Sequence, residues 1–219
     1  MINLFQRIKH WQLFLALILP LLLFFPLMFA HVTSNLLAAV DKTRLPDPNL
    51  MLRPLLWMPA LALVPMLLVC AWHWSVGVGM HHLLPQGMKM RQGLFKAAII
   101  VPLVYMCLIM SGLVMLPDVL INMDNNPKPE LIGMVIMIPI VVLLHLASIA
   151  GLFYSIWHCA KVLKSVELQR EARGSEYIGE FFLFWFNYIG IWILQPRINR
   201  IERGELGPKQ EDFFTEYSN

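Results

Sequence analysis

Residues 11–30 of the chain read WQLFLALILPLLLFFPLMFA, a run that contains no Asp, Glu, Lys, Arg or His. At a rise of about 1.5 Å per residue, about twenty helical residues cross the hydrocarbon core of a bilayer. Two basic residues, Arg7 and Lys9, stand directly before the run. The stretch therefore predicts a membrane-spanning helix and points to a membrane protein.

A cleaved signal peptide is the competing interpretation of the same stretch, because the N-terminus is basic and Ala38–Ala39 follows the run. The apolar part of a signal peptide usually has about 7–15 residues. This run is longer and contains Pro20 and Pro26. These features favour an uncleaved signal-anchor helix.

Three further apolar runs follow along the chain. We expect four membrane spans, over about residues 11–31, 55–79, 97–116 and 131–157, packed as a bundle within residues 1–160. Only 14% of the residues are charged, whereas soluble domains carry about 25%. The four spans contain no Asp, Glu, Lys or Arg. Ion-coupled carriers, proton pumps and voltage sensors use such groups inside the membrane, so these classes are disfavoured.

The basic residues predict the orientation of the spans. With the N-terminus inside, 13 of the 17 Lys and Arg residues fall on the cytoplasmic side, and only Lys42, Arg44, Arg53 and Lys128 fall outside. Lys and Arg near the ends of spans favour the cytoplasm. We therefore expect a multi-pass protein of a bacterial inner membrane with both termini in the cytoplasm.

Residues 161–203 are expected to form two cytoplasmic elements, followed by a flexible tail over residues 204–219. The stretch Lys161–Glu180 alternates in charge, which predicts a solvated amphipathic helix that extends the fourth span. Residues 177–195 are rich in aromatic side chains, and Glu180 and Asn187 lie seven residues apart on one helical face. We expect an interfacial or shallow re-entrant helix with this polar stripe toward water. A fifth crossing is the alternative.

Small residues form two stripes at helical spacing. They are Ala71, Ser75 and Gly79 in the second span and Ala147, Gly151 and Ser155 in the fourth. Small side chains let helix backbones approach closely in membranes. We expect these two stripes to pack, within one subunit or between subunits.

Histidines are the candidate cofactor ligands. His73 in the second span and His145 in the fourth would be the axial pair of a bis-histidine haem. A second group of soft ligands is Cys70, His73, His81, His82, His158 and Cys159, although its spacing matches no recognised metal site. A neutral histidine can also simply bond a neighbouring carbonyl group. We expect no metal and no cofactor, and keep haem or metal redox chemistry as a distant alternative.

Two segments, Lys164–Arg170 and Tyr177–Asn199, resemble the C-terminal part of small, uncharacterised multi-span membrane proteins of bacteria. The second reads YIGEFFLFWFNYIGIWILQPRIN, with Tyr188 where the resemblance leads us to expect a proline. The resemblance implies a bacterial inner-membrane setting and carries over no activity.

The sequence contains no nucleophile elbow, zinc-protease helix or phosphate-binding glycine loop. We therefore assign no catalytic residue and expect a non-enzymatic structural or assembly component, as a homo-oligomer or with a membrane-protein partner, and without nucleic acid. Anionic lipids are the expected cytoplasmic ligands. The expected contact surface consists of Glu180, Trp185, Asn187, Trp192, Arg197 and Arg200. The alternative function is a small transporter or channel for a neutral or apolar solute, built on proline-kinked helices.

Overall fold

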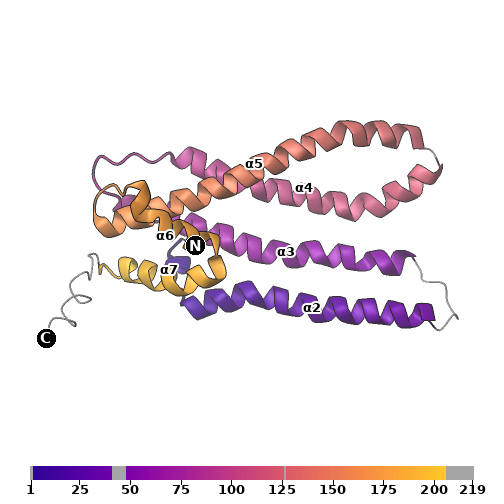
Figure 1. Ribbon diagram of the computed structural model, residues 1–219, viewed down its shortest axis with the longest axis horizontal. Coiled ribbons are helices and arrows are strands. Elements are labelled where there is room, and N and C mark those ends of the chain that lie inside the picture. The colour runs from indigo at the N-terminus through magenta and orange to yellow at the C-terminus, as the bar shows by residue number, and fades with distance from the viewer. Residues whose placement is uncertain (1, 41–47, 126, 206–219) are drawn as a thin grey trace. The chain divides into compact units, whose positions relative to one another are not determined.

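The computed structural model describes residues 2–40, 48–125 and 127–205. Within these ranges all regular secondary structure is helical, as the sequence predicted (Figure 1). The elements are α1 (Ile2–Arg7), α2 (His10–Val40), α3 (Pro48–Gly77), the 3-10 helix η1 (His81–Leu83), α4 (Gln92–Asn125), α5 (Pro127–Leu168), α6 (Gly174–Trp185) and α7 (Asn187–Glu202). The tail expected over residues 204–219 lies outside the described residues from residue 206 onward.

Four of the described helices are long and apolar enough to cross a membrane, which confirms the expected number. The apolar segments are His10–Ser34, Leu63–Leu83, Gln92–Gly112 and Val135–Leu168. The helices α2 to α5 are longer than the spans expected from hydropathy, because the polar residues that flank each apolar run stay helical.

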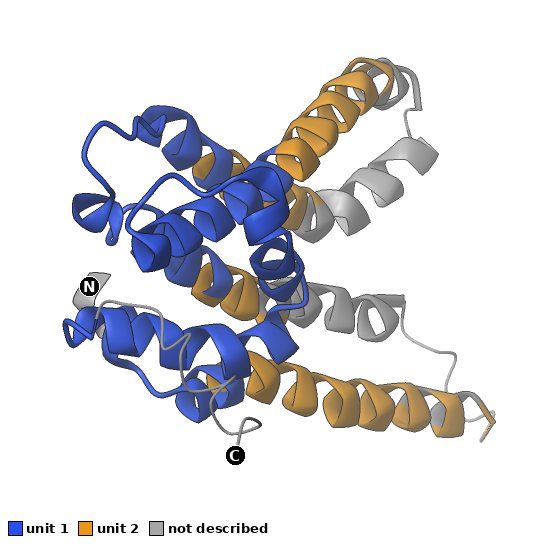
Figure 2. Cartoon of the chain, turned by 60° about the vertical axis from the view of Figure 1, so that its left-hand side comes forward, with its two compact units in different colours: residues 1–15, 69–99, 151–219 blue, residues 16–68, 100–150 orange. Residues whose placement is uncertain are grey.

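The chain forms two compact units, and α2, α3, α4 and α5 each contribute residues to both of them. Unit 1 comprises residues 1–15, 69–99 and 151–219, and unit 2 comprises residues 16–68 and 100–150 (Figure 2). The helix α5 runs through residue 160, the expected end of the bundle, to Leu168, and the sequence predicted such an extension of the fourth span.

The charged stretch after the fourth span does not form one long helix, contrary to the sequence prediction. Gln169 ends α5 with a positive φ of 51°, a conformation that few residues other than glycine adopt. The backbone N–H of Ala172 then donates to the buried Ser165 hydroxyl at 3.0 Å. This bond folds the connection back along α5, and α6 begins at Gly174.

The aromatic segment is two helices rather than one, which corrects the prediction of a single helix over residues 177–195. Phe186 leaves the helical region with φ −86° and ψ 58°, and its N–H donates to the Phe182 carbonyl at 2.8 Å. Its own carbonyl accepts the N–H groups of Ile189 and Gly190 and so starts α7. A side chain at Gly190 would collide with the Leu183 carbonyl group, so this glycine allows the close approach of α6 and α7. We call residues 174–202 the α6–α7 hairpin.

Unit 1 has an aromatic core that fixes α6 against α3. The ring centroid of the buried Phe184 lies 5.1 Å from Trp72 and 5.5 Å from His73. The buried face of α7 supplies Ile191, Leu194 and Ile198. Burying each such side chain stabilises the fold by about 1.5–3 kcal/mol.

Unit 2, taken by itself, exposes apolar side chains along its helices. Leu27, Phe29, Val135 and Leu143 are each more than 60% exposed. The Ser and Thr hydroxyls in its described helices bond back to carbonyls of their own helix, as Ser148 does to Leu144 at 2.7 Å. Such a helix exposes few unpaired polar groups.

Candidate functional site

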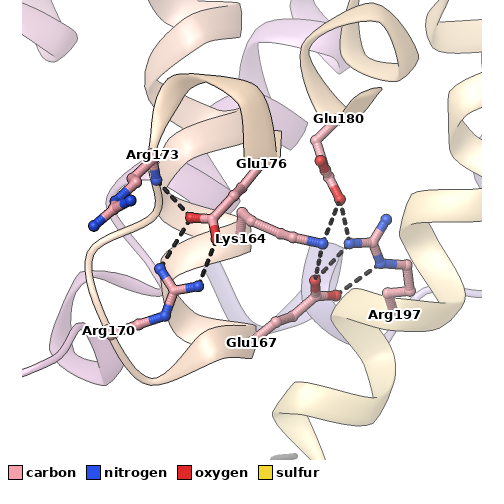
Figure 3. A network of polar contacts seen from close by, with 7 residues as sticks. All are labelled: Lys164, Glu167, Arg170, Arg173, Glu176, Glu180 and Arg197. Atoms are coloured by element: carbon pink, nitrogen blue, oxygen red, sulfur yellow. Dashed lines mark hydrogen bonds and ion pairs between the residues drawn. The ribbon is translucent and has the colours of Figure 1, made fainter. Parts of the chain in front are cut away.

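Four charged side chains join α5 to both arms of the α6–α7 hairpin; we call them the ion cluster. Its members are Lys164, Glu167, Glu180 and Arg197. Arg197 makes a two-pronged contact with Glu167, at 2.7 Å through Nε and 2.5 Å through Nη2. The same Nη2 lies 2.7 Å from Glu180 Oε1, and Lys164 Nζ lies 3.4 Å from that oxygen. Figure 3 shows both cations pointing at both carboxylates.

Glu180 is the buried member of the ion cluster, and this corrects the expectation that it faces water. Its side chain is only 7% exposed. Burial raises the pKa of the Glu180 carboxyl, but the hydrogen bond from Arg197 and the charges of Arg197 and Lys164 outweigh it, so the pKa stays below its ordinary value. Burial lowers the pKa of the Arg197 guanidinium, and the hydrogen bonds and charges of Glu167 and Glu180 more than reverse this. Glu180 and Arg197 are therefore both ionised at neutral pH.

A second ion pair stabilises the start of α6. Arg170 donates through both terminal nitrogens to the Glu176 carboxylate, at 2.9 and 2.5 Å, and the backbone N–H of Arg173 donates to it at 2.7 Å (Figure 3). The side-chain hydrogen bond from Arg170, then the backbone bond from Arg173, lower the pKa of Glu176 to about 2. The carboxylate thus serves as the N-terminal cap of α6.

Gln195 connects α7 to α3 and to the N-terminal residues. It is fully buried. Its Oε1 accepts the indole N–H of Trp72 at 2.8 Å. Its Nε2 lies 2.7 Å from the Phe5 carbonyl and 3.1 Å from the Ile8 carbonyl. The Gln195 amide thereby supplies a hydrogen-bond donor to two backbone carbonyls at the C-terminal end of α1. The helix α1 also packs against α7.

The outer face of the α6–α7 hairpin is apolar. Its exposed side chains are Ile178, Phe182, Trp185, Phe186, Tyr188, Ile189, Trp192 and Ile193. They recur at helical spacing on both arms, opposite the buried Glu180, Phe184 and Gln195. We call this set the aromatic face.

Two tryptophans of the predicted contact surface attach the aromatic face to neighbouring helices. Trp185 meets Phe153 of α5 edge to face, with ring centroids 4.5 Å apart. The ring centroid of Trp192 lies 4.8 Å from that of His10 and 5.4 Å from that of Phe14, both in α2. Each ring nevertheless keeps almost half of its surface exposed. Both tryptophans can therefore make further contacts.

The other members of the predicted contact surface are less available. Arg197 is engaged in the ion cluster, and Asn187 is half-buried at the hairpin turn. Arg200 Nε lies 3.4 Å from Glu205. The structure brings Glu180 and Arg197 together as an internal ion pair. That pair lies on the inner side of the hairpin, opposite the aromatic face.

A polar pocket lies where α1 meets the last turn of α7. It has a volume of about 390 Å³ and is lined, among the described residues, by Gln6, Arg7, Asn199, Glu202 and Arg203. Arg7 contacts Glu202 at 3.0 Å, and Gln6 donates from its buried amide to the Ser75 carbonyl at 3.0 Å. We call this the α1–α7 pocket.

The small-residue stripes have partners in the structure that the sequence did not specify. A Cβ at Gly151 would lie 2.8 Å from the Ala98 carbonyl oxygen of α4. Ser155 Oγ lies 3.3 Å from His73 Nδ1 of α3. Ser75 and Gly79 are buried, Ala71 is half-buried and Ala147 is exposed. Packing of the two stripes on each other stays a prediction.

The histidines proposed as haem ligands have separate local partners. The His73 side chain is buried in unit 1, where its Nδ1 lies beside the Ser155 hydroxyl. The backbone carbonyl of His73 accepts a hydrogen bond from the Cys159 thiol at 3.3 Å. His145 belongs to unit 2, where its Nδ1 lies 3.0 Å from the Tyr105 hydroxyl. Among the described residues no three His, Cys, Asp or Glu side chains gather as a metal site.

Sequence reasoning missed Gln195 and the α1–α7 pocket. The signal for Gln195 is a lone amide after the apolar run 188–194, because a polar side chain placed there needs a partner. Its partners lie 123 and 190 residues away in the chain, so local pattern does not identify them.

Comparison of the chain with protein-family models, with curated proteins and with solved structures gave no match.

Proposed function

We propose that this chain is a structural or assembly component of a bacterial inner membrane, with four spans and both termini in the cytoplasm. In this proposal the α6–α7 hairpin is its cytoplasmic contact surface, for a second copy of the chain or for another membrane protein. The resemblance of Lys164–Asn199 to small multi-span proteins of bacteria agrees with this setting.

Membrane insertion is supported by the composition of the long helices and by pairs of Trp and Lys at one end of them. Lys96 Nζ lies 5.9 Å from the Trp74 ring, and Lys161 Nζ lies 5.7 Å from the Trp157 ring. Tryptophan prefers the headgroup level, and lysine extends its ammonium group to water from there. All four residues belong to unit 1, which therefore fits the cytoplasmic boundary of the bilayer.

One observation carries the contact role: the hairpin is fixed by charge on its inner side and apolar on its outer side. Placing two carboxylates and two cations in a half-buried cluster has a large desolvation cost, which offsets much of their mutual attraction. In this proposal the cluster contributes a defined geometry of the hairpin more than net stability. The rigid hairpin then presents Phe182, Trp185 and Ile189 outward. Exposed aromatic side chains on a fixed scaffold are typical of contact sites.

The test is photo-crosslinking in cells, with a crosslinking amino acid placed at Phe182 or Ile189. We expect discrete protein adducts of fixed mass from both positions. A matched control at Leu27 of α2, which is 62% exposed, should yield lipid adducts alone. Normal accumulation of the protein without any protein adduct from the hairpin positions would refute the contact role.

A second measurement separates this role from transport. The double variant Phe182→Ala and Ile189→Ala should lose its oligomer or its partner, while Phe29→Ala in α2 should keep them. Solute movement in liposomes containing only the purified wild-type chain would instead favour the transporter.

A further inference from the structure

The α1–α7 pocket is lined by two guanidinium groups and one carboxylate, those of Arg7, Arg203 and Glu202. Arg7 pairs with Glu202. Arg203 contacts Glu205, outside the lining, at 2.9 Å, and it shares that carboxylate with Arg200, which lies 3.4 Å from it. The excess positive charge lies at the rim of a pocket large enough for a small ligand.

Hydrogen-bond donors remain available in this pocket. Arg7 uses Nε and Nη2 for Glu202, and Arg203 uses Nε and Nη2 for Glu205. Each guanidinium carries five N–H donors, so both retain Nη1 and further hydrogens for an anion. The side chains of Arg7 and Arg203 are 71% and 58% exposed, which leaves these donors accessible.

The pocket floor is held by hydrogen bonds to α3 and to the residues after α1, which distinguishes it from a simple surface patch. Gln6 is 4% exposed and bonded to the Ser75 carbonyl. Asn199 donates to the Ile8 carbonyl at 3.2 Å and also contacts Gln195. These bonds tie α7 to the residues after α1 and α1 to α3, and so define the backbone that carries Arg7 and Arg203.

We propose that the α1–α7 pocket binds the phosphate-bearing headgroup of an anionic phospholipid. Guanidinium groups are suited to phosphate because their donors match its oxygens in pairs. A lipid is the source that fits, because the aromatic face lies on the same hairpin and its Trp and Tyr rings favour the headgroup level. The inference deepens the proposed function and rests on it only for the membrane setting.

The test titrates the full-length chain in neutral detergent with phosphatidylglycerol or phosphatidylcholine and follows bound lipid by native mass spectrometry. We expect one tightly held phosphatidylglycerol per chain. Each basic residue contributes about 1 kcal/mol to binding of an anionic lipid surface, so the double variant Arg7→Gln, Arg203→Gln should bind it roughly 30-fold more weakly. Arg173→Gln removes one charge from the exposed start of α6 and should leave the affinity unchanged.

A gain-of-binding variant guards against loss of fold. Glu202→Gln removes the negative charge opposite Arg7 and should tighten phosphatidylglycerol binding by about fivefold. Equal affinity for phosphatidylglycerol and phosphatidylcholine would overturn the proposal, since arginines that serve only to neutralise the carbonyl ends of α1 and α7 would give that result. Inorganic phosphate that binds as tightly as the lipid would also overturn it, in favour of a soluble anion.

The two proposals fail separately. Loss of lipid preference with crosslinks from Phe182 and Ile189 intact would remove the pocket and leave the contact role. A preference for phosphatidylglycerol without crosslinks from Phe182 and Ile189 would remove the contact role and leave the lipid-binding pocket.

Discussion

Glu180 shows how a single carboxylate determines the position of two helices. It lies on α6, and its cationic partners come from α5 and α7. Removing one partner from a largely buried ion pair typically costs about 3–5 kcal/mol, because the remaining charge is left unpaired. We therefore attribute part of the defined placement of the hairpin to this residue, beside the buried apolar contacts of Phe184 and Leu194.

The acid groups of α6 predict a dependence of stability on pH. The pKa of Glu176 is lowered to about 2 and that of Glu180 is also below its ordinary value of 4.5. A depressed folded-state pKa stabilises the fold above the unfolded value of about 4.3, and this contribution disappears as the pH falls toward the folded value. The thermal midpoint of the chain in phosphatidylcholine nanodiscs should therefore fall between pH 4.5 and about pH 2.

Two variants test the origin of that effect. Glu176→Gln and Glu180→Gln should each lower the midpoint at pH 7 and reduce its change on acidification. A wild-type midpoint that is the same at pH 3 as at pH 7 would rule out the ion pairs as its cause.

Gln195 predicts a large loss of stability from a change that preserves size. Gln195→Leu leaves the buried indole N–H of Trp72 and the carbonyl of Phe5 without their amide partner, while the Ile8 carbonyl keeps its bond from Asn199. Each unpaired buried group costs about 1–3 kcal/mol. We expect a clearly lower thermal midpoint and faster hydrogen exchange over residues 2–8. Gln86→Leu, at an exposed position, is the control, and equal behaviour of the two variants would contradict the role of Gln195.

At the scale of elements, the hairpin turn depends on one close approach. Gly190→Ala would place a methyl group against the Leu183 carbonyl, whereas a Cβ at Gly179 on α6 meets no atom within 4 Å. Overpacking costs about 1–3 kcal/mol, while alanine for glycine in a free helical position gains up to about 1 kcal/mol. Gly190→Ala should destabilise the chain and Gly179→Ala should not, as measured by thermal unfolding. If both are neutral, α6 and α7 do not touch as described.

The long helices could be predicted from sequence and the hairpin could not, for a physical reason. A run such as residues 11–30 predicts a long helix without information from the rest of the chain, because the length of an apolar run determines whether it can span a bilayer. The breaks at Gln169 and Phe186 depend on partners elsewhere. Ser165 receives the Ala172 N–H, and Glu180 is held from α5 and α7. A periodic pattern therefore predicts a continuous helix where tertiary contacts favour two.

Candidate ligands were harder to place than elements, since residue type alone does not give distance. His73 and His145 are both polar residues in apolar helices, yet each has a local partner in Ser155 and Tyr105. The arginines of the α1–α7 pocket come from opposite ends of the sequence. No spacing rule connects Arg7 to Arg203.

At the scale of the whole molecule, the proposed topology predicts the side of each connector. Green fluorescent protein fused after residue 219 should fluoresce, because it stays in the cytoplasm, and alkaline phosphatase fused at residue 44 should be active outside. Fusions exchanged between the two positions serve as controls. An active phosphatase at residue 219 would overturn both the orientation and the cytoplasmic contact surface.

The bonds from Gln195 to Phe5 and Ile8 join residues 190 and 187 positions apart in the chain, and this has a consequence for biogenesis. At about 5–20 residues per second, the ribosome needs roughly 10–40 s to make Gln195 after Phe5. During that interval the nascent N-terminus lacks its amide partner. Unit 1 is therefore completed late in synthesis, and a chain released before residue 195 lacks the amide that bonds the Phe5 carbonyl.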